Sequence, residues 1–225
     1  MVGKGERMMG RYHTVLFDMD GTILDTLDDL TDSVNYTLRQ MGFPERTREE
    51  VRAYLGYGSR RLIEQALGET TELKTVDEAF RIYRAWYGTH AQIKTKPYGG
   101  IADVMRALRA RGIRVAVASN KPEATVKTLC EYHFPALVDV AVGDVEWRAH
   151  KPEPDMIDAV LVELGVSRSG AVYVGDTEVD VETAQNADLP VIAVGWGFRS
   201  RAQQRTAGAS VFADTPDELL RLLTE

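Results

Sequence analysis

The sequence predicts an α/β fold, in which a parallel sheet carries helices on both faces and an all-helical segment is inserted near its start. Short, fully apolar runs alternate with amphipathic stretches from residue 101 onward, which is typical of such a sheet. Residues 27–93, in contrast, show helical periodicity and no strand pattern. A chain of 225 residues can bury a substantial core and hold one domain with an inserted subdomain.

The first predicted strand, residues 15–17, ends on a pair of acids. Asp18 and Asp20 are two positions apart in an extended segment, so their carboxylates should share one space. They repel each other, which is costly unless a cation or a reaction uses them. Gly21 and Thr22 then predict a turn with free backbone N–H groups beside the acids. By itself, Asp-x-Asp-Gly is equally compatible with a calcium loop or an ordinary turn.

The inserted segment contains four predicted helices. Apolar residues recur at helical spacing from Leu27 to Met41, and Gly42 stops the run. Thr47 and Glu50 form a capping-box pair that opens a second helix, which continues to residue 55. A third helix follows the break at residues 56–61 and a fourth spans about 75–93, before residues 97–100 close the segment.

After the insert, strands and helices alternate to the end of the chain. Gly112 ends the first of these helices and Gly165 stops a later one. The predicted strands are 115–118, 138–142, 171–174, 191–194 and 210–213, and the predicted helices are 101–111, one from about 122, 152–164 and 215–223.

Polar residues follow several of these apolar strands. In parallel α/β sheets, ligands bind beyond the carboxyl ends of the strands, where Asp18, Ser119, Asn120 and Asp176 are expected to meet. The Ser119 hydroxyl and the backbone amides of the following helix start could hold a phosphate oxygen. A plain N-cap role for Ser119 is the alternative.

Three further charged residues complete the candidate site. Lys151 stands directly before a helix opened by Pro152, where an isolated lysine is usually solvated. Asp176 and Asp180 are four apart at a helix start and therefore lie on one helical face. They could serve only the helix dipole. Together with the acids after the first strand, they would form the oxygen-rich site that magnesium prefers.

These motifs resemble those of the haloacid dehalogenase superfamily of phosphohydrolases. The string DMDGTILDT at 18–26 resembles motif I, and Ser119, Lys151 and residues 175–180 resemble motifs II to IV in order. The resemblance covers residues 12–223 and implies a Rossmann-like sheet with the motif I strand at its centre. It implies a catalytic core of residues 1–24 and 96–225 and a helical cap of residues 25–95. Within the superfamily, Pro97-Tyr98-x-Gly100, Asn120-Lys121-Pro122 and Gly195-Trp196-Gly197 look most like phosphoglycolate phosphatases.

The resemblance also implies a role for each motif residue. Asp18 would attack phosphorus to form an aspartyl-phosphate, and Asp20 would protonate the leaving group and later activate water. Ser119 and Lys151 would complete the catalytic set. The implied ligands of Mg²⁺ are Asp18, the backbone carbonyl of Asp20, and Asp176, with Asp180 in support. The implied substrate contacts are Gly21, Thr22, Asn120 and, by similarity to mutases with this cap, Arg60.

The cap loop leaves one choice open. Adjacent helical residues point about 100° apart, so at most one of Arg60 and Arg61 should face the active site. The following apolar face does not settle which. Solvated surface charge is an equal alternative for both.

The expected function is magnesium-dependent hydrolysis of a small phosphomonoester, with phosphoglycolate favoured. Dehalogenases and phosphonatases of the superfamily lack the second aspartate, so Asp20 argues against both. A sugar-phosphate mutase, a pyrophosphatase or nucleotidase, and a catalytically silent partner-binding protein remain as alternatives.

Composition restricts the partners. A net charge of −7 argues against nucleic acid, and no apolar run approaches the roughly 18 residues of a membrane helix. Residues 1–13 lack the apolar stretch of a secretory signal and are expected to be a loose lead-in. The single cysteine, Cys130, excludes an internal disulfide, fits a reducing cytoplasm and sits among apolar residues that predict packing. No heptad pattern stands out, so a monomer or weak dimer is expected.

Overall fold

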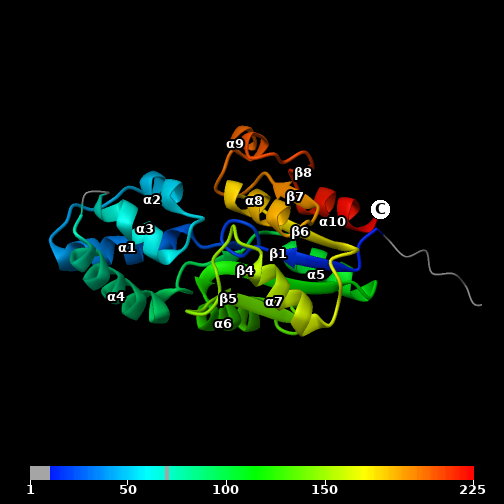
Figure 1. The fold of residues 1–225 in the computed structure, drawn as a ribbon, viewed down its shortest axis with the longest axis horizontal. Coiled ribbons are helices and arrows are strands. Elements are labelled where there is room, and N and C mark those ends of the chain that lie inside the picture. The colour runs from blue at the N-terminus through cyan, green and yellow to red at the C-terminus, as the bar shows by residue number, and fades with distance from the viewer. Residues whose placement is uncertain (1–10, 69–70) are drawn as a thin grey trace, which may run out of the picture.

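The structure, a computed structural model, describes residues 11–68 and 71–225 (Figure 1). Residues 1–10 of the expected loose lead-in lie outside the described residues. Its end is not loose, because Tyr12 is buried in the core and the His13 N–H donates to the Gly170 carbonyl at 2.8 Å. A six-stranded sheet has the order β5-β4-β1-β6-β7-β8, with β1 in its interior. Every pairing in this sheet is parallel, as predicted. The strands are β1 (Thr14–Phe17), β4 (Arg114–Pro122), β5 (Val140–Asp144), β6 (Ala171–Gly175), β7 (Val191–Val194) and β8 (Phe212–Ala213).

Helices cover both faces of the sheet. Side chains alternate along a strand, so Val15 and Phe17 face one side while Leu16 faces the other. The first side packs against α5, α6 and α10, and the second packs against α7 and α8. The core helices are α5 (Ile101–Ala110), α6 (Glu123–His133), α7 (Asp155–Leu164), α8 (Glu178–Asn186), α9 (Arg201–Thr206) and α10 (Pro216–Thr224).

Four further helices form a separate group beyond one end of the strands (Figure 1). Their apolar faces meet in a cluster of their own, and the capping box of Thr47 and Glu50 is confirmed at the start of the second one. The short strands β2 (Leu24–Asp25) and β3 (Lys96–Pro97) pair antiparallel, so the chain leaves and re-enters the core at neighbouring points. The helices are α1 (Leu27–Met41), α2 (Arg48–Tyr54), α3 (Ser59–Leu67) and α4 (Leu73–His90).

Several element ends differ from the prediction, and for two of them the reason is identifiable. Strand β4 continues beyond residue 118 because Pro122 pairs with Asp144 after a shift in register, so α6 begins only at Glu123. Helix α4 ends at His90 rather than near residue 93. The buried Asp29 carboxylate accepts the backbone N–H of Lys94 at 2.9 Å and of Thr95 at 2.8 Å, which holds this stretch out of the helix. No helix of residues 11–68 and 71–225 is long and apolar enough to cross a membrane.

Candidate active site

The carboxyl end of β1 places two acids in one pocket, as their spacing predicts. Asp18 is buried, and its backbone N–H donates to the Val174 carbonyl at 2.8 Å, which extends the pairing of β1 with β6. Asp20 is more accessible, and its Oδ1 accepts a hydrogen bond of 2.6 Å from the Thr26 hydroxyl. Both carboxylates line the same pocket.

The turn after Asp20 corrects one expectation, because its N–H groups are not free. The N–H of Gly21 donates to the Leu24 carbonyl at 2.9 Å, and that of Thr22 donates to the Met19 carbonyl at 3.3 Å. Gly21 has a φ of +85°, and a Cβ there would collide with the Asp176 carboxylate. The Thr22 hydroxyl donates to Asp176 Oδ1 at 2.8 Å. The predicted substrate contacts of Gly21 and Thr22 are therefore not supported, since both residues serve the acid cluster.

Strand β6 and helix α8 position the next two acids. Asp176 follows the strand, and Asp180 lies in the first turn of α8, where it forms a capping box with Thr177. Asp180 Oδ2 accepts the N–H of Asp176 at 3.1 Å, the N–H of Thr177 at 3.0 Å and the Thr177 hydroxyl at 2.7 Å. Asp180 therefore fixes the backbone that presents Asp176.

Lys151 is buried against two of these acids. Its Nζ lies 2.8 Å from Asp18 Oδ1 and 2.8 Å from Asp180 Oδ1, and it donates to the Tyr173 hydroxyl at 3.0 Å. Burial lowers the pKa of Lys151, but Asp18 and Asp180 together raise it to well above its usual range. The ammonium therefore remains charged beside Asp18.

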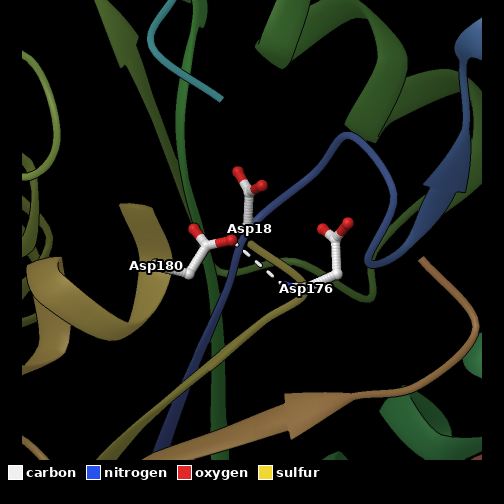
Figure 2. A group of neighbouring side chains, drawn as sticks. All are labelled: Asp18, Asp176 and Asp180. Carbon is white, nitrogen blue, oxygen red and sulfur yellow. Dashed lines mark hydrogen bonds between the residues drawn. The ribbon is translucent and has the colours of Figure 1, made fainter. Parts of the chain in front are cut away.

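Three carboxylates converge at this edge of the sheet (Figure 2). Asp18, Asp176 and Asp180 each offer an oxygen within 4.8 Å of the others. Burial raises the pKa of Asp18 to about 7, and the Asp180 carboxylate adds to the rise. Burial, followed by repulsion from Asp180 and Asp18, raises the pKa of Asp176 well above its usual range.

This donor set fits a hard divalent cation. All the available ligands are oxygens, and one lysine cannot neutralise three buried carboxylates. Asp180 already accepts from Lys151, Thr177 and the Asp176 N–H. Asp176 Oδ1 and Oδ2 each accept one hydrogen bond, from Thr22 and from the Phe198 N–H, which leaves each oxygen a lone pair. Asp18 and Asp176 are thus the better placed ligands, with Asp180 in support.

The pocket lies between the carboxyl ends of the strands and the helical insert. Ser119 is buried and lines it beside Asp18. Asn120 also lines it, but its amide is already engaged. Its Nδ2 donates to the carbonyls of Gly56 and Lys151, both at 3.0 Å, and its Oδ1 accepts the Lys151 N–H at 2.8 Å. Asn120 therefore joins the insert to the Lys151 loop, and a direct substrate contact is not supported.

Arg60 does not contribute to the lining of this pocket. Its guanidinium forms ion pairs with Asp77 at 2.6 Å and with Glu64 at 3.3 Å, at a partly exposed site on the insert. Arg61 pairs with Glu64 at 3.4 Å. Among the described lining residues, this loop contributes Gly58 and Ser59 instead. The substrate-binding role of Arg60 stays a prediction that its position does not support.

Lys121 is a site residue that the sequence analysis did not assign. Its ammonium lies 3.0 Å from Asp20 Oδ1 and contacts the hydroxyl of Tyr87, which comes from α4 of the insert. Lys121 occurs in the Asn-Lys-Pro segment noted in the sequence, but nothing local indicates that it is buried. Tyr83 and Tyr87 have only the spacing of one helical face, which does not predict a pocket.

Arg199 also went unassigned, and it joins the insert to the core. This buried side chain donates to the Arg52 carbonyl at 2.9 Å and the Leu55 carbonyl at 2.6 Å, both at the end of α2, and pairs with Glu178 at 2.8 Å. In return, Arg52 donates to the Phe198 carbonyl at 2.8 Å. The N–H of Phe198 donates to Asp176 Oδ2 at 2.6 Å, so this loop connects the insert with a candidate cation ligand.

The fold and the site define an α/β protein with an inserted helical segment and a candidate cation site at the carboxyl edge of its sheet. Residues 15–194 match the family of haloacid dehalogenase-like hydrolases, and the chain belongs to this family.

Individual relatives agree with this assignment. The chain is 31% identical to the phosphoglycolate phosphatase of Aquifex aeolicus, over 82% of this chain and 85% of that protein. A crystal structure from Lactobacillus delbrueckii subsp. bulgaricus, assigned as a phosphoglycolate phosphatase, is 36% identical with a TM-score of 0.91, and the match covers 95% of this chain and 99% of that one. CbbY from Rhodobacter sphaeroides, in complex with phosphate, is 28% identical with a TM-score of 0.74 over 92% and 96% of the two chains.

Proposed function

We propose that the protein is a magnesium-dependent phosphatase that hydrolyses a small phosphomonoester, with phosphoglycolate as the favoured substrate. One observation carries the proposal: Asp18, Asp20 and Lys151 line one pocket, and Asp176 lies close to Asp18. This arrangement supports a nucleophile and an acid–base group that act on the same phosphate ester.

Asp18 is the nucleophile in this proposal. Its carboxylate oxygen forms a bond to phosphorus while the bond from phosphorus to the ester oxygen breaks, which leaves an aspartyl-phosphate. Lys151, 2.8 Å from Asp18, offsets part of the negative charge at this point. A magnesium ion bound by Asp18 and Asp176 would supply the remaining charge neutralisation that phosphoryl transfer needs.

Asp20 moves the protons in both halves of the reaction. Its carboxyl group gives a proton to the departing alkoxide and later takes one from the water that attacks the aspartyl-phosphate. The Thr26 hydroxyl at 2.6 Å and the Lys121 ammonium at 3.0 Å hold this carboxyl group in the pocket. The second half releases inorganic phosphate and restores Asp18.

The substrate preference is supported by the relatives and by the pocket. Two of the compared proteins are described as phosphoglycolate phosphatases, and CbbY binds phosphate. The insert contributes Leu30, Leu55 and Leu62 to the lining of the pocket, which limits the room beyond the reacting phosphate and favours a small ester. In this proposal, residues 25–95 act as a cap over residues 1–24 and 96–225. With a single cysteine the chain cannot form an internal disulfide, which supports a reducing compartment such as the cytoplasm.

A screen of phosphorylated metabolites with the purified protein tests this function. We expect hydrolysis of phosphoglycolate that requires Mg²⁺, stops on chelation and is lost in Asp18→Asn, which removes the nucleophile and nearly conserves the shape. Asp158→Asn, an exposed acid on α7, is the matched control and should retain activity. Turnover near the wild-type rate in Asp18→Asn would exclude the proposed nucleophile. Preferred turnover of a sugar phosphate, pyrophosphate or a nucleotide would replace phosphoglycolate, and no turnover of any ester would favour a silent binding protein.

A further inference from the structure

A second cation faces the active-site pocket beside Asp20. Lys121 is 3% exposed, and its Nζ lies 3.0 Å from Asp20 Oδ1. The ammonium also contacts the Tyr87 hydroxyl and lies 4.5 Å from the centroid of the Tyr87 ring. An ammonium has three N–H donors, so Asp20 and Tyr87 leave one of them for a ligand.

Lys151, in contrast, is directed toward the acid cluster. Within residues 11–68 and 71–225, the basic side chains that line the pocket are Lys121 and Lys151. The Lys151 Nζ donates to Asp180 Oδ1 at 2.8 Å and to the Tyr173 hydroxyl at 3.0 Å, and it forms an ion pair with Asp18 Oδ1 at 2.8 Å, so its charge is directed toward the acid cluster. A negative group on the substrate other than the reacting phosphate would therefore meet Lys121 rather than Lys151.

An unsatisfied hydroxyl lines the same pocket. Tyr83 of α4 is 1% exposed and lines the pocket, and its hydroxyl has no hydrogen-bond partner in the described part of the chain. The Ser59 side chain approaches it without completing a hydrogen bond. The Tyr83 ring is stacked on Tyr87, with 5.4 Å between the ring centroids. A buried hydroxyl without a partner is costly, and a bound acceptor removes that cost.

We propose that Lys121 and Tyr83 form a subsite for an anionic group on the leaving alcohol, which is a carboxylate in phosphoglycolate. The inference rests on the phosphatase function proposed above. Asp20 acts on the ester oxygen, and in a glycolate ester the carboxylate is one carbon away from that oxygen. A cation in contact with Asp20 is therefore placed to bind this carboxylate, and Lys121 is the specificity-determining residue of the pocket.

A ratio of two substrates tests the subsite. Phosphoglycolate carries the distal carboxylate, whereas ethyl phosphate is an alkyl ester of similar size without it. Any effect that Lys121 exerts through Asp20 acts on both alkyl leaving groups and largely cancels in the ratio of their kcat/KM values. In Lys121→Met we expect this ratio to fall about ten- to a hundredfold, because a charge-assisted contact is lost.

Two further variants separate the subsite from general damage. Tyr83→Phe keeps the stacked ring and should lower the ratio roughly three- to tenfold, as expected for a neutral hydrogen bond. Lys127→Met, at an exposed lysine of α6, should leave the ratio unchanged. Thermal unfolding of each variant shows whether it is folded. If Lys121→Met does not fold, the substrate ratio of Tyr83→Phe decides whether the subsite exists.

The possible results are distinct. The subsite is supported if the ratio of kcat/KM for phosphoglycolate to that for ethyl phosphate falls in Lys121→Met and Tyr83→Phe and is unchanged in Lys127→Met. An unchanged ratio in folded Lys121→Met and Tyr83→Phe overturns it and leaves Lys121 as a positioning residue for Asp20. A wild-type enzyme that hydrolyses both esters without preference also overturns it, while the phosphatase function stands. A wild-type protein that hydrolyses neither ester removes the proposed function and the subsite together.

Discussion

At the scale of single residues, the site combines charged side chains whose burial would be costly if either partner were absent. Lys151 and Asp18 are both buried, and each reduces the cost of burying the other. Asp20 differs because its carboxylate is more accessible and is held by Thr26 and Lys121 rather than by the acid cluster. Two carboxylates two positions apart thus occupy different surroundings, which suits a nucleophile and an acid–base group.

The environment of Asp20 leads to a prediction about leaving groups. Asp20→Asn should slow phosphoryl transfer from an alkyl phosphate about 10²- to 10⁴-fold, because a general acid is lost. An aryl phosphate such as 4-nitrophenyl phosphate, whose leaving group needs no proton, should lose far less in this step. Single-turnover measurements with both esters check the difference, and equal losses would contradict the acid role.

His150, next to Lys151, predicts a dependence of stability on pH. Its ring lies 2.6 Å from Asp144, and this hydrogen bond raises the pKa of His150 above its usual value although partial burial opposes the rise. A raised histidine pKa stabilises the fold fully below the unfolded-state pKa of about 6.5, and the contribution disappears as pH rises through the higher folded-state pKa.

Asp144→Asn should therefore lower the free energy of unfolding by up to about 1 kcal/mol at pH 5.5, as for other partly exposed pairs. The loss should shrink toward that of a neutral hydrogen bond at pH 9. Urea unfolding at both pH values measures it. A difference between wild type and variant that is the same at pH 5.5 and pH 9 would show that His150 ionisation is not involved.

At the scale of elements, the loop after β7 connects the helical insert with the acid cluster. The Phe198 side chain packs in the apolar cluster of the insert, while its N–H holds Asp176. Arg199 donates to the last carbonyls of α2, and a cation also suits the negative end of a helix dipole. A displacement of α2 would thus be transmitted to Asp176 through one short loop.

Arg199→Met should release α2 from the core. We expect a loss of about 1–3 kcal/mol in the free energy of unfolding, because buried carbonyls and Glu178 lose their donor. Hydrogen exchange of residues 48–55 should accelerate at the same time. Arg201→Met, a more exposed position that pairs with Asp214, is the control and should change neither quantity appreciably. Unchanged exchange in Arg199→Met would show that other contacts hold α2.

At the scale of the whole molecule, two apolar cores meet at a charged boundary. The insert and the sheet each bury their own cluster, and the pocket lies between them with Asp18, Asp20, Lys121 and Lys151 in its walls. A cation bound by the acid cluster would therefore stabilise the folded state, because the unfolded chain cannot assemble carboxylates from β1, β6 and α8.

Magnesium should raise the melting temperature. At a concentration of 100 times its Kd, a ligand adds about 2.7 kcal/mol, which corresponds to roughly 5–11 °C for a chain of this size. The rise should reverse with EDTA and largely disappear in Asp176→Asn, while Asp158→Asn should retain it. An equal rise in both variants would place magnesium elsewhere on the protein.

The sequence by itself determined the features that depend on neighbouring residues. Apolar runs and their periodicity predicted the parallel sheet, its helices and the helical insert, because these patterns arise within one element. Asp18, Asp20 and Asp176 follow strands, Asp180 lies in the first turn of a helix, and Ser119 follows the apolar part of β4. Their meeting at one edge could therefore be inferred from the geometry of parallel sheets.

Only the tertiary structure decided which side chains meet across elements. Lys121 and Tyr87 are 34 positions apart, and Arg199 lies 147 positions from Arg52, so no local pattern records these contacts. Arg60 forms an ion pair with Asp77 on a neighbouring helix. The backbone N–H groups of the turn after Asp20 donate to carbonyls within that turn. Such choices depend on competition among all partners within reach, and those partners are set by the packing of the insert against the core.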